Sequence, residues 1–403
     1  MGSDAVGAAC PSPFAEEAIP KHPVLSSSTF RRRRVSPGIP TLLDAADVRF
    51  LRLGRIALSA ALQMIGIGPG DKVLLPAYHC VSMVEPALKA GATPVFYRIA
   101  PGALVDLDDL ERRMVGARAI IAPHYFGFHQ PMPDIRRIAD RHGAALIEDC
   151  AHCLFGEIDG TRVGGFGDYA IASPWKFLPV NEGGCLVVNR NAGAPLTIRG
   201  RAPSEEAKAL LNLIEVSLAY GRLPRVGMLA RPLLALADYR NRRRRARRGP
   251  RAPKDENPRR ADATPLAAID AMTAVCRTIV RRADLERVVT LRRQYYRELL
   301  EAWRELPGAR PLHAELPDNV VPQVFPLVVE APEARFAPLK AAGVPIIRFG
   351  EYLWEGLEPG TCRVTEALSR QVFQFPCHQE LRPDEVRWLA ATVRDVLHRT
   401  RHC

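Results

Sequence analysis

The stretch of sequence that decides the fold runs from Ala144 to Val188 and reads AALIEDCAHCLFGEIDGTRVGGFGDYAIASPWKFLPVNEGGCLVV. Its first apolar run ends in two carboxylates, Glu148 and Asp149. A single lysine of this stretch, Lys176, follows 27 residues after Asp149, just past a second apolar run. Short apolar runs bounded by polar residues indicate buried strands. The acid and the lysine are therefore expected at or just beyond the ends of two strands.

An acid and a lysine placed in this way suit an enzyme that holds pyridoxal 5′-phosphate (PLP). The lysine would form a Schiff base with the cofactor, and the acid would face the pyridine nitrogen. Lys176 and Asp149 are thus the expected catalytic residues, and both are also expected to bind the cofactor. The sequence gives no reason to expect a metal site.

Around this stretch, strand-like apolar runs alternate with helical periodicity, which predicts a mostly parallel sheet covered by helices on both faces. Ligands of such sheets gather at the carboxyl ends of the strands. Arg55, His79, Asp149 and Ser173 fall at such ends or at a helix start. The strands are expected at residues 72–76, 94–97, 119–122, 144–147, 168–172 and 185–188.

The chain is expected to divide into three parts. Residues 1–38 are rich in Ser, Pro and Arg and are interpreted as a poorly ordered N-terminal arm. Residues 39–264 are expected to form a large cofactor-binding domain, with a helix near 42–50 and an Arg-rich insertion at 222–262. Residues 265–403 would form a long bridging helix, to about Leu306, and a small C-terminal α+β domain. With 403 residues and 47% hydrophobic content, the chain can bury both cores.

The net charge of +12 is concentrated in two runs. Four arginines stand at 31–34, and residues 240–260 hold eleven basic residues and two acids, so the rest of the chain is close to neutral. We expect the second run to be a solvated insertion. Binding of nucleic acid and steering of an anionic substrate are the alternatives.

Neither a membrane-spanning segment nor a disulfide framework is expected. No apolar run approaches 18 residues and the first residues lack the pattern of a signal peptide, so a cytoplasmic protein is the default expectation. The chain has nine cysteines, an odd number. Cys150 and Cys153 form a CxxC pair, for which packing is the expected role and a redox or metal role the alternative.

Six segments, in order, resemble the DegT/DnrJ/EryC1/StrS aminotransferases, and the resemblance covers residues 47 to about 190 and, more loosely, 265–398. It implies a PLP-dependent transferase of fold type I (aspartate-aminotransferase-like) that works as a homodimer. It also implies transfer of an amino group from an amino-acid donor to a carbonyl, such as that of a keto-sugar, in polysaccharide or natural-product biosynthesis. The segments are GIGPGDKVLLPAY (66–78), GATPVFYRI (91–99), APHYFG (122–127), IEDCAH (147–152), GGFGDYA (164–170) and NEGGCLVV (181–188).

The resemblance implies a role for each residue on the cofactor side. Lys176 would carry PLP and move a proton between the substrate carbon and C4′ of the cofactor. Asp149 would keep the pyridine nitrogen protonated. His152 stands where the family has a glutamine that contacts the 3′ oxygen of the ring, and Ser173, in an S-x-x-K spacing, would hold the phosphate.

Two further positions depart from the family pattern. Gly54 and Arg55 replace its Gly-Thr at the start of the first helix, where backbone N–H groups would bind the phosphate and the guanidinium would add a fork to it. His79 or Cys80 stands where relatives place an aromatic ring over the cofactor. Cys80 is the direct counterpart, and a stack of His79 on the ring is the other interpretation.

The substrate side is not reproduced. Relatives carry an Asn-Tyr-Arg element before the long helix. Residues 255–266 do not reproduce it, and Asn257 and Arg259 are at best loosely similar to its Asn and Arg. The alternatives are another PLP reaction, such as dehydration, and a non-catalytic homologue with a binding or regulatory role. Dehydratase relatives tend to replace the lysine by histidine, so Lys176 favours transamination.

Overall fold

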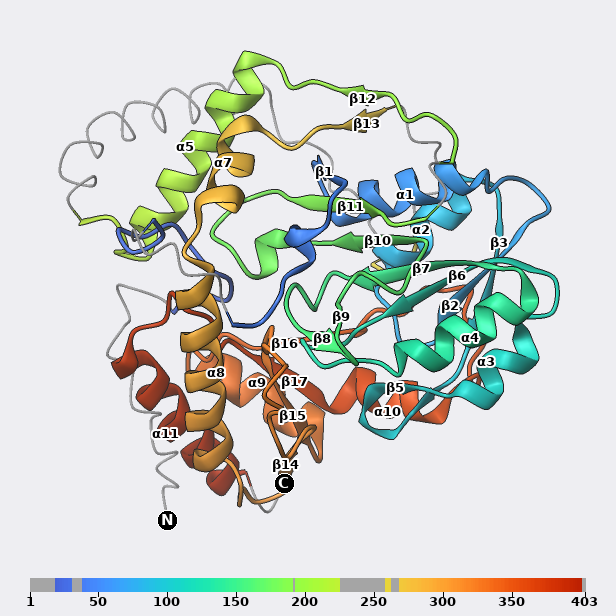
Figure 1. Cartoon of the computed structure of the whole chain (residues 1–403). Coiled ribbons are helices and arrows are strands. Elements are labelled where there is room, and N and C mark those ends of the chain that lie inside the picture. Colours follow the sequence, from blue (N-terminus) through green and yellow to red (C-terminus); the bar gives the residue numbers. More distant parts are fainter. Residues whose placement is uncertain (1–18, 31–37, 191–192, 225–257, 262–267, 401–403) are drawn as a thin grey trace, which may run out of the picture.

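A computed structural model of the chain describes residues 19–30, 38–190, 193–224, 258–261 and 268–400 (Figure 1). The arginine run at 31–34, nearly all of the Arg-rich insertion and Asn257 lie outside these ranges, as does most of the expected N-terminal arm. Among the described helices, none is long and apolar enough to cross a membrane.

A seven-stranded, mostly parallel sheet forms the larger part of the fold, as the alternating pattern predicts. The five strands β10, β7, β6, β2 and β3 are parallel to one another, whereas β11 is antiparallel to both β10 and β1. In spatial order the strands are β1 (Val48–Leu51), β11 (Gly184–Val188), β10 (Tyr169–Ala172), β7 (Ala145–Cys150), β6 (Ala117–Pro123), β2 (Lys72–Pro76) and β3 (Thr93–Tyr97).

Helices cover both faces of this sheet (Figure 1). On one face α1 packs against α2, β10 and β11, and on the other α3 and α4 contact each other and β3, β6 and β7. This arrangement buries the strands on both sides, which explains their continuous apolar runs. The helices are α1 (Gly54–Ile65), α2 (Val81–Lys89), α3 (Leu107–Arg113) and α4 (Met132–His142).

The C-terminal part of the chain forms a second, antiparallel sheet (Figure 1). Its core is aromatic, with Trp303 at 5.0 Å from Phe325 and 4.8 Å from Phe375 between ring centroids. The strands are β14 (Ala309–Pro311), β15 (Phe325–Val329), β17 (Val372–Phe375) and β16 (Ile347–Arg348), in that spatial order. The helices are α8 (Leu285–Ala302), α9 (Pro332–Ala341), α10 (Arg363–Gln371) and α11 (Pro383–Arg399).

The remaining elements are short or connect the two sheets. Two of the helices, α5 and α7, pack against each other. They are α5 (Pro203–Ala219) and α7 (Ala274–Arg282), with the strand pairs β4 (Ile99–Ala100) and β5 (Leu104–Val105), β8 (Glu157–Ile158) and β9 (Thr161–Arg162), and β12 (Ile198–Arg199) and β13 (Ile269–Asp270).

Two sequence predictions are wrong. The helix expected near residues 42–50 is a single 3-10 turn, Leu42–Asp44, followed by β1, because pairing with β11 overrides the helical pattern. The long bridging helix is broken into α7 and α8. Ala283 is extended there, and the side chain of Asp284 caps α8 by accepting a hydrogen bond from the Arg287 N–H at 3.0 Å.

The sheet brings the decisive residues of the sequence to one edge. Strands β7 and β10 are parallel and in register, with Asp149 opposite Ile171. Ser173 follows β10 directly, so it lies beside Asp149 at the carboxyl end of the sheet. Helix α1 packs on β10 and begins at the same edge, at Gly54.

Candidate active site

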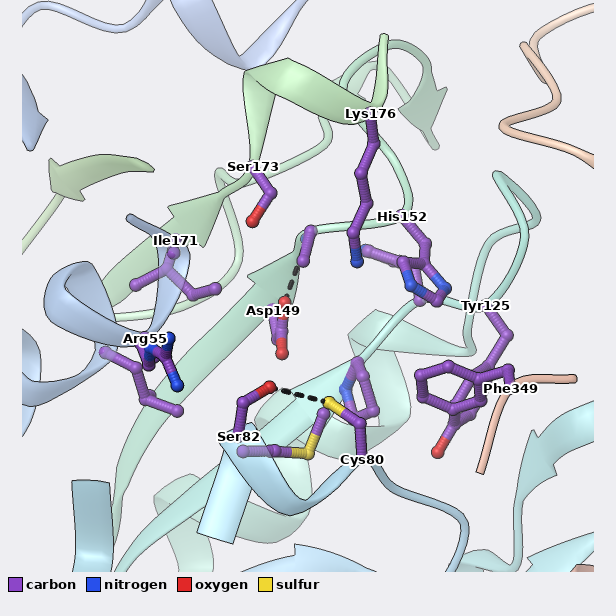
Figure 2. A pocket seen from close by; sticks show the side chains of 16 residues that line it. Arg55, Cys80, Ser82, Tyr125, Asp149, His152, Ile171, Ser173, Lys176 and Phe349 are labelled. Carbon is purple, nitrogen blue, oxygen red and sulfur yellow. Dashed lines mark hydrogen bonds between the residues drawn. The ribbon is translucent and has the colours of Figure 1, made fainter. Parts of the chain in front are cut away.

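Six of the seven predicted site residues line one pocket at this edge (Figure 2). The space enclosed, including its open mouth, is about 490 Å³, which suits a small cofactor. The six residues are Gly54, Arg55, Asp149, His152, Ser173 and Lys176.

Lys176 is the last residue of a one-turn 3-10 helix, Pro174–Lys176, that follows Ser173. Its side chain keeps some accessible surface because it lines an open pocket, yet protein atoms crowd around its amine. This burial lowers the pKa of Lys176 below its ordinary value, and nearby Cys80 and Asp149 oppose the shift. Burial of this kind favours a neutral, nucleophilic amine.

Asp149 comes from the end of β7 and faces the same pocket (Figure 2). Its Oδ1 accepts a hydrogen bond from the Ala151 N–H at 2.8 Å, which fixes the carboxylate and leaves Oδ2 for a ligand. Burial raises the pKa of Asp149, while the Ala151 N–H and the charge of Lys176 oppose this rise. A cationic ligand group facing Asp149 would supply the partner that a buried carboxylate needs.

The start of α1 and Ser173 form a cradle. Ser173 points its hydroxyl into the pocket (Figure 2), and no side chain caps the N-terminus of α1. A Cβ at Gly54 would overlap Ser173 Oγ, so a larger residue there would force the hydroxyl to turn away from its present position. N–H groups at a helix start that no side chain caps, next to a hydroxyl, favour an anion such as phosphate.

Arg55 lines the pocket but its guanidinium is half exposed and paired with Glu85 of α2, with Nη1 3.2 Å from Oε2. The expected pair of hydrogen bonds from the Arg55 guanidinium to a phosphate would therefore compete with this ion pair. That contact stays a prediction.

His152 is buried in the wall of the pocket. Its ring lies edge-on to Phe349, with centroids 4.9 Å apart, and 6.0 Å from Phe126. Its Nδ1 has no hydrogen-bond partner among the described residues. Burial lowers the pKa of His152 well below its ordinary value, so the ring is neutral at pH 7. A buried polar atom beside a pocket calls for a ligand atom or water.

His79 is the one predicted site residue that does not line the pocket. Its ring is fully buried and stacks on Phe96, with centroids 5.0 Å apart. Nδ1 lies 3.1 Å from the Pro76 carbonyl oxygen, and Nε2 accepts from the Trp354 N–H at 3.1 Å. Because both ring nitrogens are used, the prediction that His79 stacks on the cofactor is corrected. Cys80, the other candidate, lines the pocket.

Arg259, the described candidate for the substrate-side Asn-Tyr-Arg element, also lies outside the pocket. Arg259 lines a separate groove, together with Trp354, and its carbonyl oxygen accepts from the Glu355 N–H at 3.0 Å. Arg259 is not among the residues that line the pocket of Lys176.

Sequence reasoning missed several residues of the pocket wall. Tyr125, within the segment APHYFG, donates its hydroxyl hydrogen to the Tyr78 carbonyl at 2.5 Å and faces the pocket. Phe349 comes from the residues just after β16, in the second sheet. The segment around Tyr125 could have indicated it, whereas nothing local marks Phe349, because its role depends on how the two sheets meet.

A buried cluster of His124, Glu148 and Cys150 adjoins the pocket, whose lining includes His124, and the ligand atoms of the three residues lie within 4.8 Å of one another. His124 Nδ1 accepts from the Gln130 N–H at 3.0 Å, so Nε2 carries the hydrogen that it donates to Glu148 Oε1, also at 3.0 Å. With both nitrogens used, the cluster is a hydrogen-bond network of the core rather than a set of free ligands.

The carboxylate of Glu148 is held from several sides. Its oxygens accept from the backbone N–H groups of Gly164 at 2.7 Å and Phe166 at 2.9 Å, in addition to His124. Burial raises the pKa of Glu148, but the hydrogen bond from His124 and the backbone N–H groups outweigh this and hold it below its ordinary value. Glu148 therefore stays ionised in the core.

The two cysteines of the CxxC pair behave as packing residues. Cys150 and Cys153 are both fully buried, and the Cys153 thiol donates to the carbonyls of Phe155 at 3.4 Å and Gly127 at 3.5 Å. The seven cysteines within the described ranges are all free. Of the two interpretations of the CxxC pair, the structure supports packing.

Taken as a set, the pocket fits a phosphorylated pyridine. A phosphate would meet the cradle at Gly54 and Ser173, a protonated ring nitrogen would meet Asp149, and an aldehyde carbon would meet Lys176. His152 Nδ1, which has no hydrogen-bond partner among the described residues, offers a further polar contact in the pocket wall.

Comparison with known proteins agrees with this reading. Residues 53–199 match the model of the DegT/DnrJ/EryC1/StrS aminotransferase family. A UDP-N-acetyl-3-dehydro-α-D-glucosamine 3-aminotransferase of Acidithiobacillus ferrooxidans is 37% identical over 159 residues, which are 36% of this chain and 41% of that protein. A GDP-perosamine synthase of Vibrio cholerae is 35% identical over 34% of this chain and 38% of that protein. The matches thus span about two fifths of these relatives' lengths.

The fold is shared over a longer stretch. A putative sugar aminotransferase of Streptococcus pneumoniae, solved in its PMP form, superposes with a TM-score of 0.66 over 95% of this chain and 98% of that one, at 17% identity. The chain therefore shares the fold of this putative sugar aminotransferase, and its residues 53–199 match the model of the DegT/DnrJ/EryC1/StrS aminotransferase family.

Proposed function

We propose that this protein is a PLP-dependent aminotransferase that moves an amino group from an amino-acid donor to the carbonyl of a keto-sugar or a related small molecule. The observation that carries the proposal is the convergence of Lys176, Asp149, Ser173 and the start of α1 in one pocket. These residues come from three separate parts of the chain, yet they offer the three contacts that the cofactor needs.

When bound, PLP supplies an electron sink that stabilises negative charge on the carbon next to the transferred nitrogen. Lys176 would hold the cofactor and then accept and return a proton through its Nζ, for which a pKa lowered by burial is suited. Asp149 would keep the ring nitrogen protonated, since an adjacent carboxylate favours the charged form.

The remaining groups would orient and enclose the cofactor. Ser173 and the first N–H groups of α1 would bind the phosphate. His152, held against Phe349, would contact the ring, and Cys80 would stand at its face in place of the family's aromatic residue. Phe349 would help to keep water out of the pocket, because it closes the wall from the side of the second sheet.

The proposals for the acceptor and the assembly are supported by the resemblance alone. The named relatives act on nucleotide-linked sugars, which supports a carbonyl of this class in polysaccharide or natural-product biosynthesis. We further propose a cytoplasmic homodimer, with residues 39–264 as the large domain and 265–403 as the small one.

The half-reaction tests this function directly. The purified protein, loaded with PLP, should be yellow, and single amino acids should be screened for the one that converts it to the pyridoxamine form. That form should then revert to the PLP form with a keto-sugar that accepts the amino group. A protein that binds no PLP, or that no amino donor converts, would contradict the proposal.

A further inference from the structure

The turn that carries Lys176 has little internal support. It is a single 3-10 turn, in which the N–H of Lys176 bonds to the Ser173 carbonyl at 3.1 Å and the N–H of Phe177 to the Pro174 carbonyl at 2.9 Å. One such turn leaves its last carbonyls, those of Lys176 and Phe177, without helical partners. The direction of the Lys176 side chain therefore depends on what holds these two carbonyls.

Arg292, from the middle of α8, holds both of them. Its Nη2 donates to the Lys176 carbonyl at 2.9 Å and to the Phe177 carbonyl at 3.3 Å. Its guanidinium also lies over the Phe177 ring, 4.7 Å from the centroid. The contact joins residues 116 positions apart in the sequence.

The other donors of Arg292 fix the guanidinium itself. Nη1 donates to the carbonyls of Pro322 at 3.1 Å and Gln323 at 2.8 Å, and Nε donates to Gln379 Oε1 at 3.0 Å. The amide of Gln379 in turn donates to the Phe177 carbonyl at 2.8 Å. The turn of Lys176 is thus tied to α8 and to two segments that flank the second sheet.

The burial of Arg292 argues for a geometric role. Its side chain is fully buried, and within the described ranges no carboxylate forms an ion pair with it. All five of its acceptors are neutral, so the planar fork of donors, rather than charge neutralisation, matches this environment. Lysine cannot reproduce the fork, since its single nitrogen reaches fewer acceptors in fewer directions.

We propose that Arg292 is a positioning residue that sets the direction of the Lys176 amine and couples it to the second sheet. This inference rests on the proposed function, because it assigns a consequence to where that amine points. The plainer alternative is that Arg292 only stabilises the core.

The neighbouring Arg293 provides a matched control. It lies on the same helix, is also buried, and donates to the carbonyls of Pro317 at 2.7 Å and Val320, with Asp318 3.1 Å away. It bonds the same connecting loop as Arg292 but does not touch the turn of Lys176. Substitution of either arginine by lysine removes a buried fork, whereas only one of the substitutions releases the turn.

The test compares Arg292→Lys with Arg293→Lys in the full-length protein. After loading with PLP, the absorbance of the lysine-bound cofactor is titrated with pH, and thermal unfolding, kcat and KM for the amino donor are measured. We expect both variants to unfold earlier than wild type. Only Arg292→Lys should displace the midpoint of the pH titration and lower kcat by roughly tenfold to a hundredfold, the effect of a catalytic group shifted by about 1 Å.

A second variant covers the case in which Arg292→Lys does not fold. Gln379→Met removes the donor to Phe177 and the acceptor of Arg292 Nε, and it should move the titration midpoint in the same direction by a smaller amount. Equal midpoints and equal kcat in wild type, Arg293→Lys and the variants that release the turn would overturn the inference. A wild-type protein that does not bind PLP through Lys176 would instead refute the proposed function and this inference with it.

Discussion

Gly54 and Ser173 lie so close together that any side chain at residue 54 would overlap the serine hydroxyl. The contact joins the start of α1 to the residue that follows β10, and it leaves the N–H groups of the helix and the hydroxyl facing the same space. A cradle of this shape is expected for a phosphate.

Gly54→Ala should weaken PLP binding. The added methyl group would displace Ser173 Oγ, and loss of one hydrogen bond to a charged group, about 1.5–3 kcal/mol, corresponds to roughly a 10- to 100-fold higher Kd. Binding is measured by titrating the apoprotein with PLP. Gly68→Ala is the control, because a Cβ there meets no atom within 4 Å. Equal affinity in Gly54→Ala and wild type would contradict the cradle.

Asp149→Asn should bind PLP but turn over slowly. The amide cannot hold the ring nitrogen in its protonated form, so we expect turnover to fall by a factor on the order of 10²–10³, as for loss of a preorganised electrostatic group. Steady-state kinetics and the content of bound PLP are the measurements. Asp168→Asn is the control, since Asp168 pairs with Arg136 outside the pocket. Full turnover in Asp149→Asn would exclude the assigned role.

Glu148→Gln should destabilise the fold by disrupting hydrogen bonds, because the cluster of His124, Glu148 and Cys150 is interpreted as a hydrogen-bond network and not as a metal site. Glu148 accepts hydrogen bonds from His124 and three backbone N–H groups, and an amide would face these donors with its own N–H atoms. We expect a loss of about 3–5 kcal/mol in the free energy of unfolding, measured in urea. Glu157→Gln, at an exposed position of β8, should change little. A wild type whose unfolding temperature falls on addition of a chelator would argue for a metal in this cluster.

His313 predicts a dependence of stability on pH. It stacks on Phe128, with centroids 3.7 Å apart, and burial lowers its pKa from 6.5 to about 4. The unfolded chain therefore binds the proton more tightly, so stability falls as the pH drops from about 6.5 towards 4. This group should account for up to about 2 kcal/mol of the loss between pH 7 and pH 5. Urea unfolding of His313→Gln at both pH values should show a smaller loss than wild type, and an unchanged difference would contradict the assignment.

The sequence predicted which residues meet around Lys176 at this edge of the sheet, because their positions depend on local structure. Asp149, Ser173 and Lys176 come from neighbouring strand ends within one stretch, and Gly54 opens a helix that packs on the same strands. Parallel pairing brings such strand ends to one edge of a sheet whatever the details of the loops.

Features that depend on contacts distant in the sequence were not predictable. Phe349 and Arg292 reach the pocket and the lysine turn from the C-terminal half, and no local pattern distinguishes them from ordinary core residues. His79 was misplaced for a related reason. Its position in the sequence suggested a stack on the cofactor, but hydrogen bonds to Pro76 and Trp354 turn its ring into the core.

The two wrong elements have different origins, one distant in the sequence and one local. The residues of β1 could have continued a helix, and only the antiparallel neighbour β11 makes them a strand. The break between α7 and α8 depends on the capping side chain of Asp284, a signal that the sequence does contain but that the helical period on both sides obscures.

The most direct test of the account is to find where PLP attaches to the chain. The protein is loaded with PLP, reduced with borohydride and digested, and the modified peptide is sequenced by mass spectrometry. The account predicts a single stoichiometric adduct on Lys176 and none in Lys176→Ala. An unmodified Lys176 in the loaded wild type, or an adduct that persists on another lysine in Lys176→Ala, would contradict it.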